Sequence, residues 1–86
     1  MVALDGDGGL FAAECKWGEA TSQDLAVLER RAALLAAELG GIRRTHVALI
    51  SARGVFDDGV VAARDSGRVT CFTAADLSSD ASTVGW

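Results

Sequence analysis

The sequence predicts a single α/β domain built on a mixed β-sheet. Its 86 residues suffice for one small domain, and half of them are hydrophobic, which favours a folded core. Apolar segments and turn residues follow one another in the order strand, strand, helix, strand, helix, strand. Because a hairpin is followed by two helical crossovers, we expect antiparallel pairing at the start and helices on the faces of the sheet.

The first two segments form a predicted hairpin. Met1 to Leu4 is the end of one strand, and Asp5 to Gly9 contains an Asp-Gly pair, a strong hairpin signal. Leu10 to Trp17 is the returning strand. With the turn centred near residues 7 and 8, antiparallel pairing joins position i to about 15 − i. Glu14 then faces position 1 or the residue before it, and Asp5 lies at the far end.

A long helix is predicted from Ser22 to Leu39. Thr21 and Asp24 have the spacing of a capping box, with Asp in place of the usual Glu. The pair Gly40-Gly41 ends the helix, because glycine readily adopts the left-handed conformation found there. One apolar stripe runs along the helix: Leu25, Leu28, Ala32, Leu35 and Leu39. We therefore expect the helix to pack across the sheet with these leucines in the core. The strand residues expected to be buried with them are Phe11, Trp17, Val47, Leu49, Val69 and Cys71.

The second half of the chain predicts two further strands and a short helix. Thr45 to Ser51 contains an apolar run without alternation, which is typical of a central strand covered on both faces. Two aspartates precede a short helix at Gly59 to Asp65, and Arg68 to Phe72 is the last strand. The domain is assigned to residues 1–77. Residues 78–86 are small and polar and are predicted to form a flexible C-terminal tail.

The composition argues against several function classes. No apolar run reaches the roughly 18 to 20 residues of a membrane span, and the first residues lack the features of a signal peptide. Cys15 and Cys71 are expected to be reduced core thiols of a cytoplasmic protein, and His46 to have no chemical role. A net charge of −4 argues against strong non-specific binding of nucleic acid. No nucleotide-binding glycine loop is present, so ATP hydrolysis is not expected.

The candidate site lies in the segment Leu10 to Trp17. Alternate side chains of a strand share one face, so Glu14 and Lys16 are presented together. Lys16 is the only lysine among eight basic residues, which suggests that an ammonium is required there, because arginine and lysine are not equivalent at a site. Two interpretations stay open: a local Glu-Lys ion pair, or half of a site for a divalent metal and a phosphate. We expect both side chains to point into a groove at the sheet edge.

These segments resemble the PD-(D/E)XK nuclease superfamily. The resemblance rests on Val2-Ala3-Leu4-Asp5, a glycine turn, and a strand with Glu14-Cys15-Lys16-Trp17 that precedes a long helix. It covers residues 2 to 77 and is strongest to the uncharacterised nuclease-like domain at the C-terminus of archaeal-type ATPases. The resemblance implies a restriction-endonuclease-like mixed sheet with flanking helices, here incomplete, and metal-dependent phosphodiester hydrolysis in the parent family.

The resemblance also implies roles for three residues. Glu14 would bind Mg²⁺ or Mn²⁺, hard cations that prefer oxygen ligands, and the backbone carbonyl of Cys15 would be another ligand. Lys16 would position the attacking water and balance charge that develops on the phosphate. The implied partners are DNA and an ATPase domain lying upstream in the parent protein.

The sequence departs from the family pattern at one essential position. The superfamily carries an Asp on the preceding strand, and usually an acidic residue on an earlier helix, but Met1 or the residue before it stands opposite Glu14. We therefore expect a nuclease-like domain cut at its active site and inactive alone. Two alternatives remain: a non-catalytic docking or regulatory module of an ATPase, and an unrelated α/β domain in which Glu-Cys-Lys is accidental.

Overall fold

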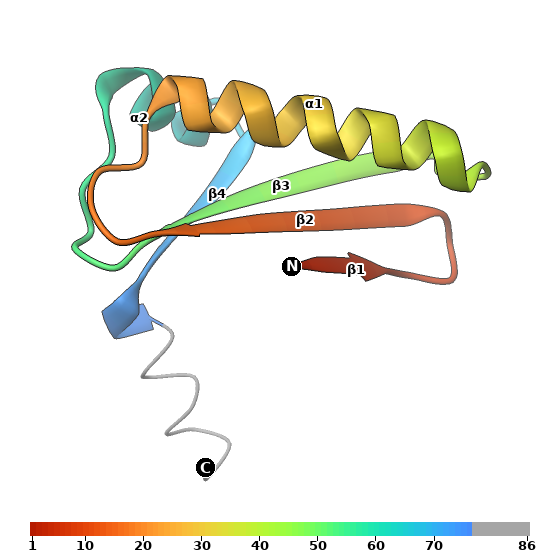
Figure 1. Ribbon diagram of the computed structural model, residues 1–86, viewed down its shortest axis with the longest axis horizontal. Helices are drawn as coiled ribbons and strands as arrows, with labels where there is room; N and C mark the ends of the chain where they lie inside the picture. Colours follow the sequence, from red (N-terminus) through yellow and green to blue (C-terminus); the bar gives the residue numbers. More distant parts are fainter. Residues whose placement is uncertain (77–86) are drawn as a thin grey trace, which may run out of the picture.

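Four strands form one mixed sheet in the computed structural model, which describes residues 1–76 (Figure 1). The elements are β1 (Val2–Leu4), β2 (Gly9–Lys16), α1 (Ser22–Leu39), β3 (Arg44–Ser51), α2 (Asp58–Asp65) and β4 (Val69–Thr73). The strand order is β1-β2-β3-β4; β1 runs antiparallel to β2, and β2, β3 and β4 run parallel. The predicted α/β class, element order and mixed sheet are confirmed. The tail predicted for residues 78–86 lies outside the described residues.

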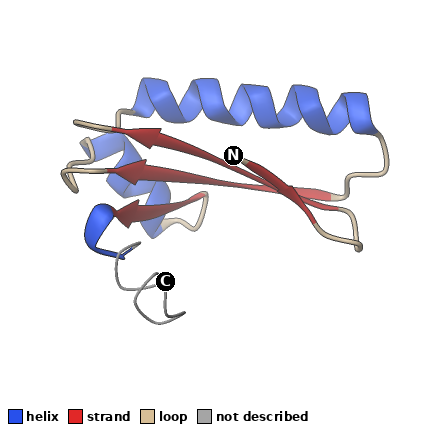
Figure 2. Ribbon diagram, turned by 60° about the horizontal axis from the view of Figure 1, so that its bottom comes forward, coloured by secondary structure: helices blue, strands red, loops and turns tan. Residues whose placement is uncertain are grey.

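Both helices lie on the same face of the sheet. The helix α1 packs on β2 and β3, while α2 packs on β4 and touches α1. Figures 1 and 2 show α1 and α2 together on one side of the sheet, whereas a helical turn at residues 74–76 follows β4 away from both. The prediction that Thr45 to Ser51 is covered on both faces is met in part: Val47 and Leu49 are buried beneath the helices. On the other face Ala48 is buried, whereas His46 is exposed.

Buried hydrophobic side chains form one core between the sheet and the helices. Its members are Leu10, Ala12, Ala20, Leu25, Leu28, Ala32, Val47, Leu49, Val60, Ala63 and Val69. Of the residues predicted to be buried, three are only half-buried: Phe11, Leu35 and Cys71. Cys15, expected to be a core thiol, and Leu39, expected in the core stripe of the helix, are exposed. The prediction for Trp17 is wrong, because this side chain is 85% exposed. The strand β2 ends at Lys16 and the chain bends at the next residue, so the indole is not carried onto the sheet.

Two aspartates cap the helices where their N-termini meet. The predicted capping box is confirmed: the Asp24 N–H donates to Thr21 Oγ1 (3.2 Å), and the Thr21 N–H donates to Asp24 Oδ2 (2.9 Å). Asp57 caps α2 by accepting from the Val60 N–H (2.8 Å), and its other oxygen accepts from the Ser22 N–H of α1 (2.7 Å). These backbone donors lower the pKa of Asp57 below its usual value. One carboxylate thus joins the starts of both helices.

The hairpin register differs by one residue from the prediction. Val2 lies opposite Ala12 and Leu4 opposite Leu10, so position i pairs with 14 − i. The Asp5 carboxylate accepts from the N–H groups of both Asp7 and Gly9, which confirms its assignment to turn chemistry. With this register, the position directly before residue 1 is the one opposite Glu14.

Replacing Leu28 by Ala should lower the free energy of unfolding by about 2–4 kcal/mol, because Leu28 is 5% exposed and its truncation leaves a cavity under α1. Urea denaturation measures the loss. The matched control is Leu34→Ala on the outer side of the same helix, where the side chain is 62% exposed; a change within about 0.5 kcal/mol is expected there. Equal losses in the two variants would contradict the assigned helix face.

Acid should destabilise the native chain more steeply than the Asp57→Asn variant. Because the folded-state pKa of Asp57 is lowered, its ionised form stabilises the fold above the unfolded pKa, near the ordinary 3.8. That stabilisation is lost as the pH falls through the folded pKa. As the pH is lowered from 6, the urea midpoints of the native chain and of Asp57→Asn should therefore converge. Asp58→Asn, at an exposed neighbouring residue, is the control. A difference between the urea midpoints of the native chain and Asp57→Asn that stays constant with pH would contradict the role of the Asp57 charge.

Candidate functional site

The strand β2 presents Glu14 and Lys16 on the face that carries α1. Leu10 and Ala12 of the same alternating set are in the core beneath the helices. The prediction that Glu14 and Lys16 point the same way is therefore confirmed. Since the core ends before residue 14, both side chains sit at the partly open border between sheet and helix, where each is about 40% exposed.

Each of these charged groups pairs with a side chain of α1 rather than with the other. Lys16 Nζ lies 3.3 Å from Asp24 Oδ1, and Glu14 Oε2 lies 3.8 Å from Arg31 Nη1. The interpretation as a local Glu-Lys pair is thus wrong. Sequence reasoning missed both partners. The sequence signal that could have indicated them is the spacing of Asp24 and Arg31. Residues seven apart are separated by about two helical turns and therefore lie on the same side of a helix.

Asp24 combines two tasks at the start of α1. Its carboxylate accepts from the Thr21 N–H and from the Thr21 hydroxyl, and it contacts Lys16. The backbone donor of Thr21 is the main cause that lowers the pKa of Asp24, with the Thr21 hydroxyl and Lys16 adding to it. The ammonium of Lys16 is therefore held beside a carboxylate that stays ionised at neutral pH.

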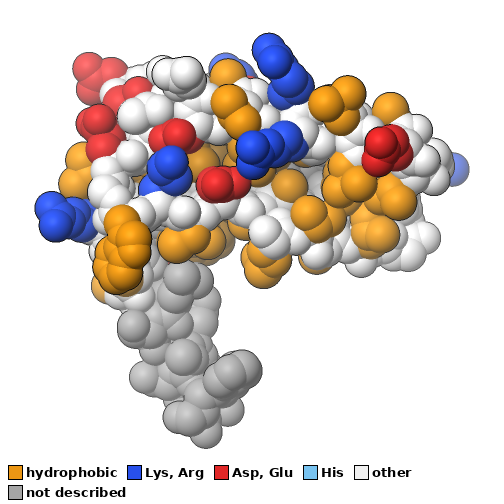
Figure 3. Space-filling view, in the orientation of Figure 1, with side chains coloured by type: hydrophobic (Ala, Val, Ile, Leu, Met, Phe, Trp, Pro, Cys, Tyr) orange, Lys and Arg blue, Asp and Glu red, His pale blue; other side chains and the backbone are white. Residues whose placement is uncertain are grey.

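Glu14 and Arg31 line a groove of about 180 Å³ between the hairpin and α1. The remaining walls are almost all apolar: Met1, Val2, Ala12, Ala13, Leu28, Ala32 and Leu35. Figure 3 shows this side of the molecule, with acidic and basic side chains next to one another between helix and sheet and hydrophobic side chains gathered to their right. Glu14 lies in the predicted groove, whereas Lys16 is not among the lining residues.

The backbone of Cys15 faces the edge of β2 that is turned away from β3. The N–H and C=O of Ala13 both pair with Met1, so alternation turns the N–H and C=O of Cys15 to the same side. In the pairing of β1 with β2, no described residue lies opposite Cys15 on that edge.

The described residues do not gather a ligand set for a metal. Residues 1–76 contain no cluster of three or more His, Cys, Asp or Glu side chains that could hold an ion. Asp5, the acidic residue of the resembling motif, lies at the other end of β2, 3.3 Å from Arg44. The N–H groups of Gly9 and Asp7 are the main causes that lower the pKa of Asp5. This carboxylate thus serves the turn and is far from Glu14.

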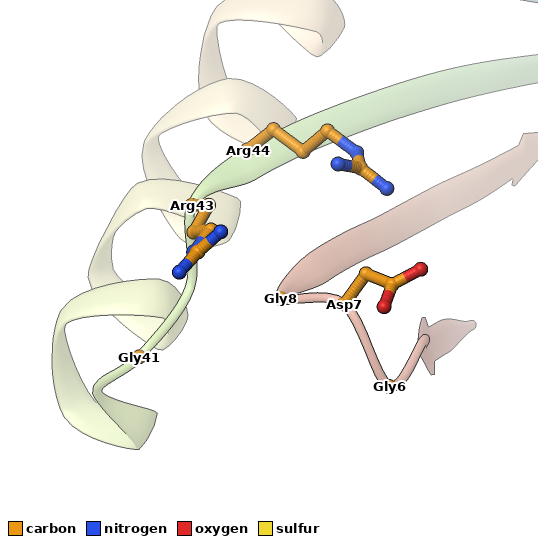
Figure 4. Close-up of a pocket in the computed structure, with 6 residues that line it drawn as sticks. All are labelled: Gly6, Asp7, Gly8, Gly41, Arg43 and Arg44. Carbon is orange, nitrogen blue, oxygen red and sulfur yellow. The ribbon is translucent and has the colours of Figure 1, made fainter.

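A second hollow, of about 590 Å³, lies at the opposite end of β2 (Figure 4). It is lined by Gly6, Asp7, Gly8, Gly41, Arg43 and Arg44. Figure 4 shows the two arginine side chains and Asp7 around it. Because Arg44 is already paired with Asp5 and the carboxylate of Asp7 faces the same space, the positive charge available to an anion is small. Nothing in the sequence singled out this hollow.

Comparisons with protein-family models, with curated proteins and with solved structures found no match to this chain. Within residues 1–76, no helix is long and apolar enough to cross a membrane. A functional assignment therefore depends on the residues of the site and on their geometry.

A double-mutant cycle on Glu14→Gln and Arg31→Gln should give a coupling energy of about 0.2–0.5 kcal/mol, because both side chains are well exposed and their contact is long. Thermal and urea unfolding of the native chain, both single variants and the double variant provide the four free energies. A coupling above about 1.5 kcal/mol would mean that the pair is a strong structural clamp.

Proposed function

We propose that this chain is the C-terminal part of a PD-(D/E)XK nuclease-like domain with a restriction-endonuclease-like fold. Glu14 and Lys16 would form half of its metal and phosphate site. The observation that carries the proposal is the hairpin register, in which Glu14 lies opposite the position directly before residue 1. That is where the resembling family carries its Asp, and an Asp there would share the face of Glu14.

The oxygen donors of Glu14 and Cys15 fit one part of such a metal site. The Glu14 carboxylate and the Cys15 carbonyl are adjacent oxygen donors, the kind that Mg²⁺ and Mn²⁺ prefer, but they are fewer than a hexacoordinate ion needs. When bound, the metal would polarise the phosphodiester and acidify a water. Glu14 is held only by an exposed contact of 3.8 Å with Arg31, which leaves the carboxylate able to exchange partners.

Lys16 would be the phosphate-facing cation of the proposed site. Its ammonium is 38% exposed and 3.3 Å from Asp24, so it can be shared between this carboxylate and an incoming anion. Lysine suits this task because its three donors rotate freely around a compact charge. DNA is the proposed substrate, an ATPase domain upstream in the parent protein is the proposed partner, and a cytoplasmic location is expected.

A second candidate function is a docking or regulatory module of an ATPase. The observation that favours it is the pairing of both site residues with α1, which gives Glu14 and Lys16 a structural task without any chemistry. The net charge of −4 agrees with it, because an acidic chain does not attract DNA. In this case the fold would persist while the hydrolytic site is lost.

The chain of 86 residues should not cleave DNA with Mg²⁺ or Mn²⁺, whereas a chain extended upstream by a strand with Asp directly before Met1 should do so. The extension supplies the second carboxylate that a protein site for Mg²⁺ normally requires. Cleavage of supercoiled plasmid is the activity readout, and Mn²⁺ titration by calorimetry is the binding readout. Lys16→Ala in the extended chain should abolish cleavage, whereas Arg30→Ala, which removes an exposed charge elsewhere on α1, should not.

Three outcomes would contradict the proposal in different ways. Cleavage by the unextended chain would show that the missing Asp is not needed. An extended chain that folds but binds no Mn²⁺ would favour the docking module or an unrelated α/β domain. Equal loss of activity in the Lys16 and Arg30 variants would remove the special role of Lys16.

A further inference from the structure

Two ion pairs lie side by side between β2 and α1, and together we call them the charged seam: Lys16 with Asp24, and Glu14 with Arg31. Glu14 and Lys16 are two residues apart on β2, so their Cα atoms are about 7 Å apart. Figure 3 shows acidic and basic side chains next to one another between helix and sheet. Because two carboxylates face two cations, the charged seam as a whole is neutral.

The two ion pairs are not held equally firmly. The Asp24 carboxylate accepts from the N–H and from the hydroxyl of Thr21, and it lies 3.3 Å from Lys16 Nζ. The contact between Arg31 Nη1 and Glu14 Oε2 is longer, 3.8 Å, and the Arg31 side chain is 69% exposed. Within residues 1–76, Glu14 is the only ion-pair partner of Arg31. A loss of charge at Glu14 therefore releases Arg31.

We propose that Arg31 is a second phosphate-binding residue of the candidate site, held by Glu14 until Glu14 binds the metal. This inference rests on the proposed function, in which Glu14 is a metal ligand and Lys16 faces the phosphate. A carboxylate that is bound to a divalent cation attracts a guanidinium less strongly. Arg31 is then free to bind the phosphate, which a guanidinium recognises with two parallel hydrogen bonds.

The charges of the completed site agree with this role. A divalent cation, together with the aspartate proposed for the position before residue 1, would add one net positive charge to the neutral charged seam. A phosphodiester carries one negative charge and would neutralise it. If Arg31 stayed on Glu14, only Lys16 would face the phosphate, and Lys16 is shared with Asp24. Arg31 thus supplies the cation that balances the substrate.

The chain of 86 residues tests this without metal, because Glu14→Gln imitates a Glu14 whose charge is neutralised. The probe is a thymidine dinucleotide, which carries a single phosphodiester. It is titrated by NMR at an ionic strength of about 0.1 M, where charges more than about 10 Å away are largely screened. Glu14→Gln should bind the dinucleotide about threefold or more tightly than the native chain does. The Arg31 Nε–H signal should shift with the same dissociation constant, whereas that of Arg30, an exposed neighbour on α1, should not.

Two further variants separate binding by Arg31 from a change in overall charge. Glu38→Gln removes an exposed carboxylate near the other end of α1, and its affinity should stay within about 1.5-fold of the native value. The double variant Glu14→Gln with Arg31→Gln should lose the gain. An affinity of Glu14→Gln no higher than that of Glu38→Gln would overturn the proposal. A gain that persists without Arg31, or an Arg31 signal that does not move, would also overturn it.

Metal binding provides a second measurement, in the chain extended upstream with Asp before Met1. There Arg31→Gln should bind Mn²⁺ as tightly as the parent or more tightly, because Glu14 no longer has a competing partner. Weaker binding would overturn the release of Arg31 by the metal. An extended chain that binds no Mn²⁺ with Arg31 in place would overturn that release and the proposed function together. The dinucleotide titration, which needs neither metal nor extension, would still decide whether Arg31 binds phosphate.

Discussion

The structure depends on the burial of one side of α1 against the β2–β3 pair. Leu25 and Leu28 pack in the same core as Leu10 and Leu49, and these two parallel strands are paired over their full eight residues. Because side chains alternate along a strand, this contact decides the direction of every residue in β2. Glu14 and Lys16 follow Leu10 toward the helix, whereas Cys15 is turned away from it. A slip of one residue would exchange the two sets.

The candidate site is a consequence of where the core ends. The apolar contact between β2 and α1 stops before residue 14, and the helix begins close to the end of the strand, so the last inward-facing positions meet its first turns. Asp24 and Arg31 are there to pair with Lys16 and Glu14. Such exposed pairs stabilise a protein little, which is compatible with a structural task and with exchange for a ligand.

The parts of the fold that sequence reasoning predicted well have local causes. The helix from Ser22 to Leu39 was predicted with its observed bounds, because a capping box and two glycines mark its ends. The parts that it missed depend on tertiary geometry. The exposure of Trp17, the hairpin register and the position of α1 and α2 on the same sheet face follow from where strands end and how they pair. The partners of Glu14 and Lys16 were missed for the same reason, since they belong to a different element.

The central claim is that the backbone groups of Glu14 and Lys16 face β3 and their side chains face α1, whereas Cys15 is turned the opposite way. Lys16 O accepts from the Ala52 N–H, so the N–H groups of Glu14 and Lys16 point to β3. The N–H of Cys15 points to the other edge of β2, where no described residue lies opposite it. Amide hydrogen exchange followed by NMR tests this most directly. The account predicts exchange at Cys15 close to the rate of an unfolded chain, and rates about 100-fold lower or less at Glu14 and Lys16. Protection of Cys15 with rapid exchange at its two neighbours would contradict the register and the site built on it.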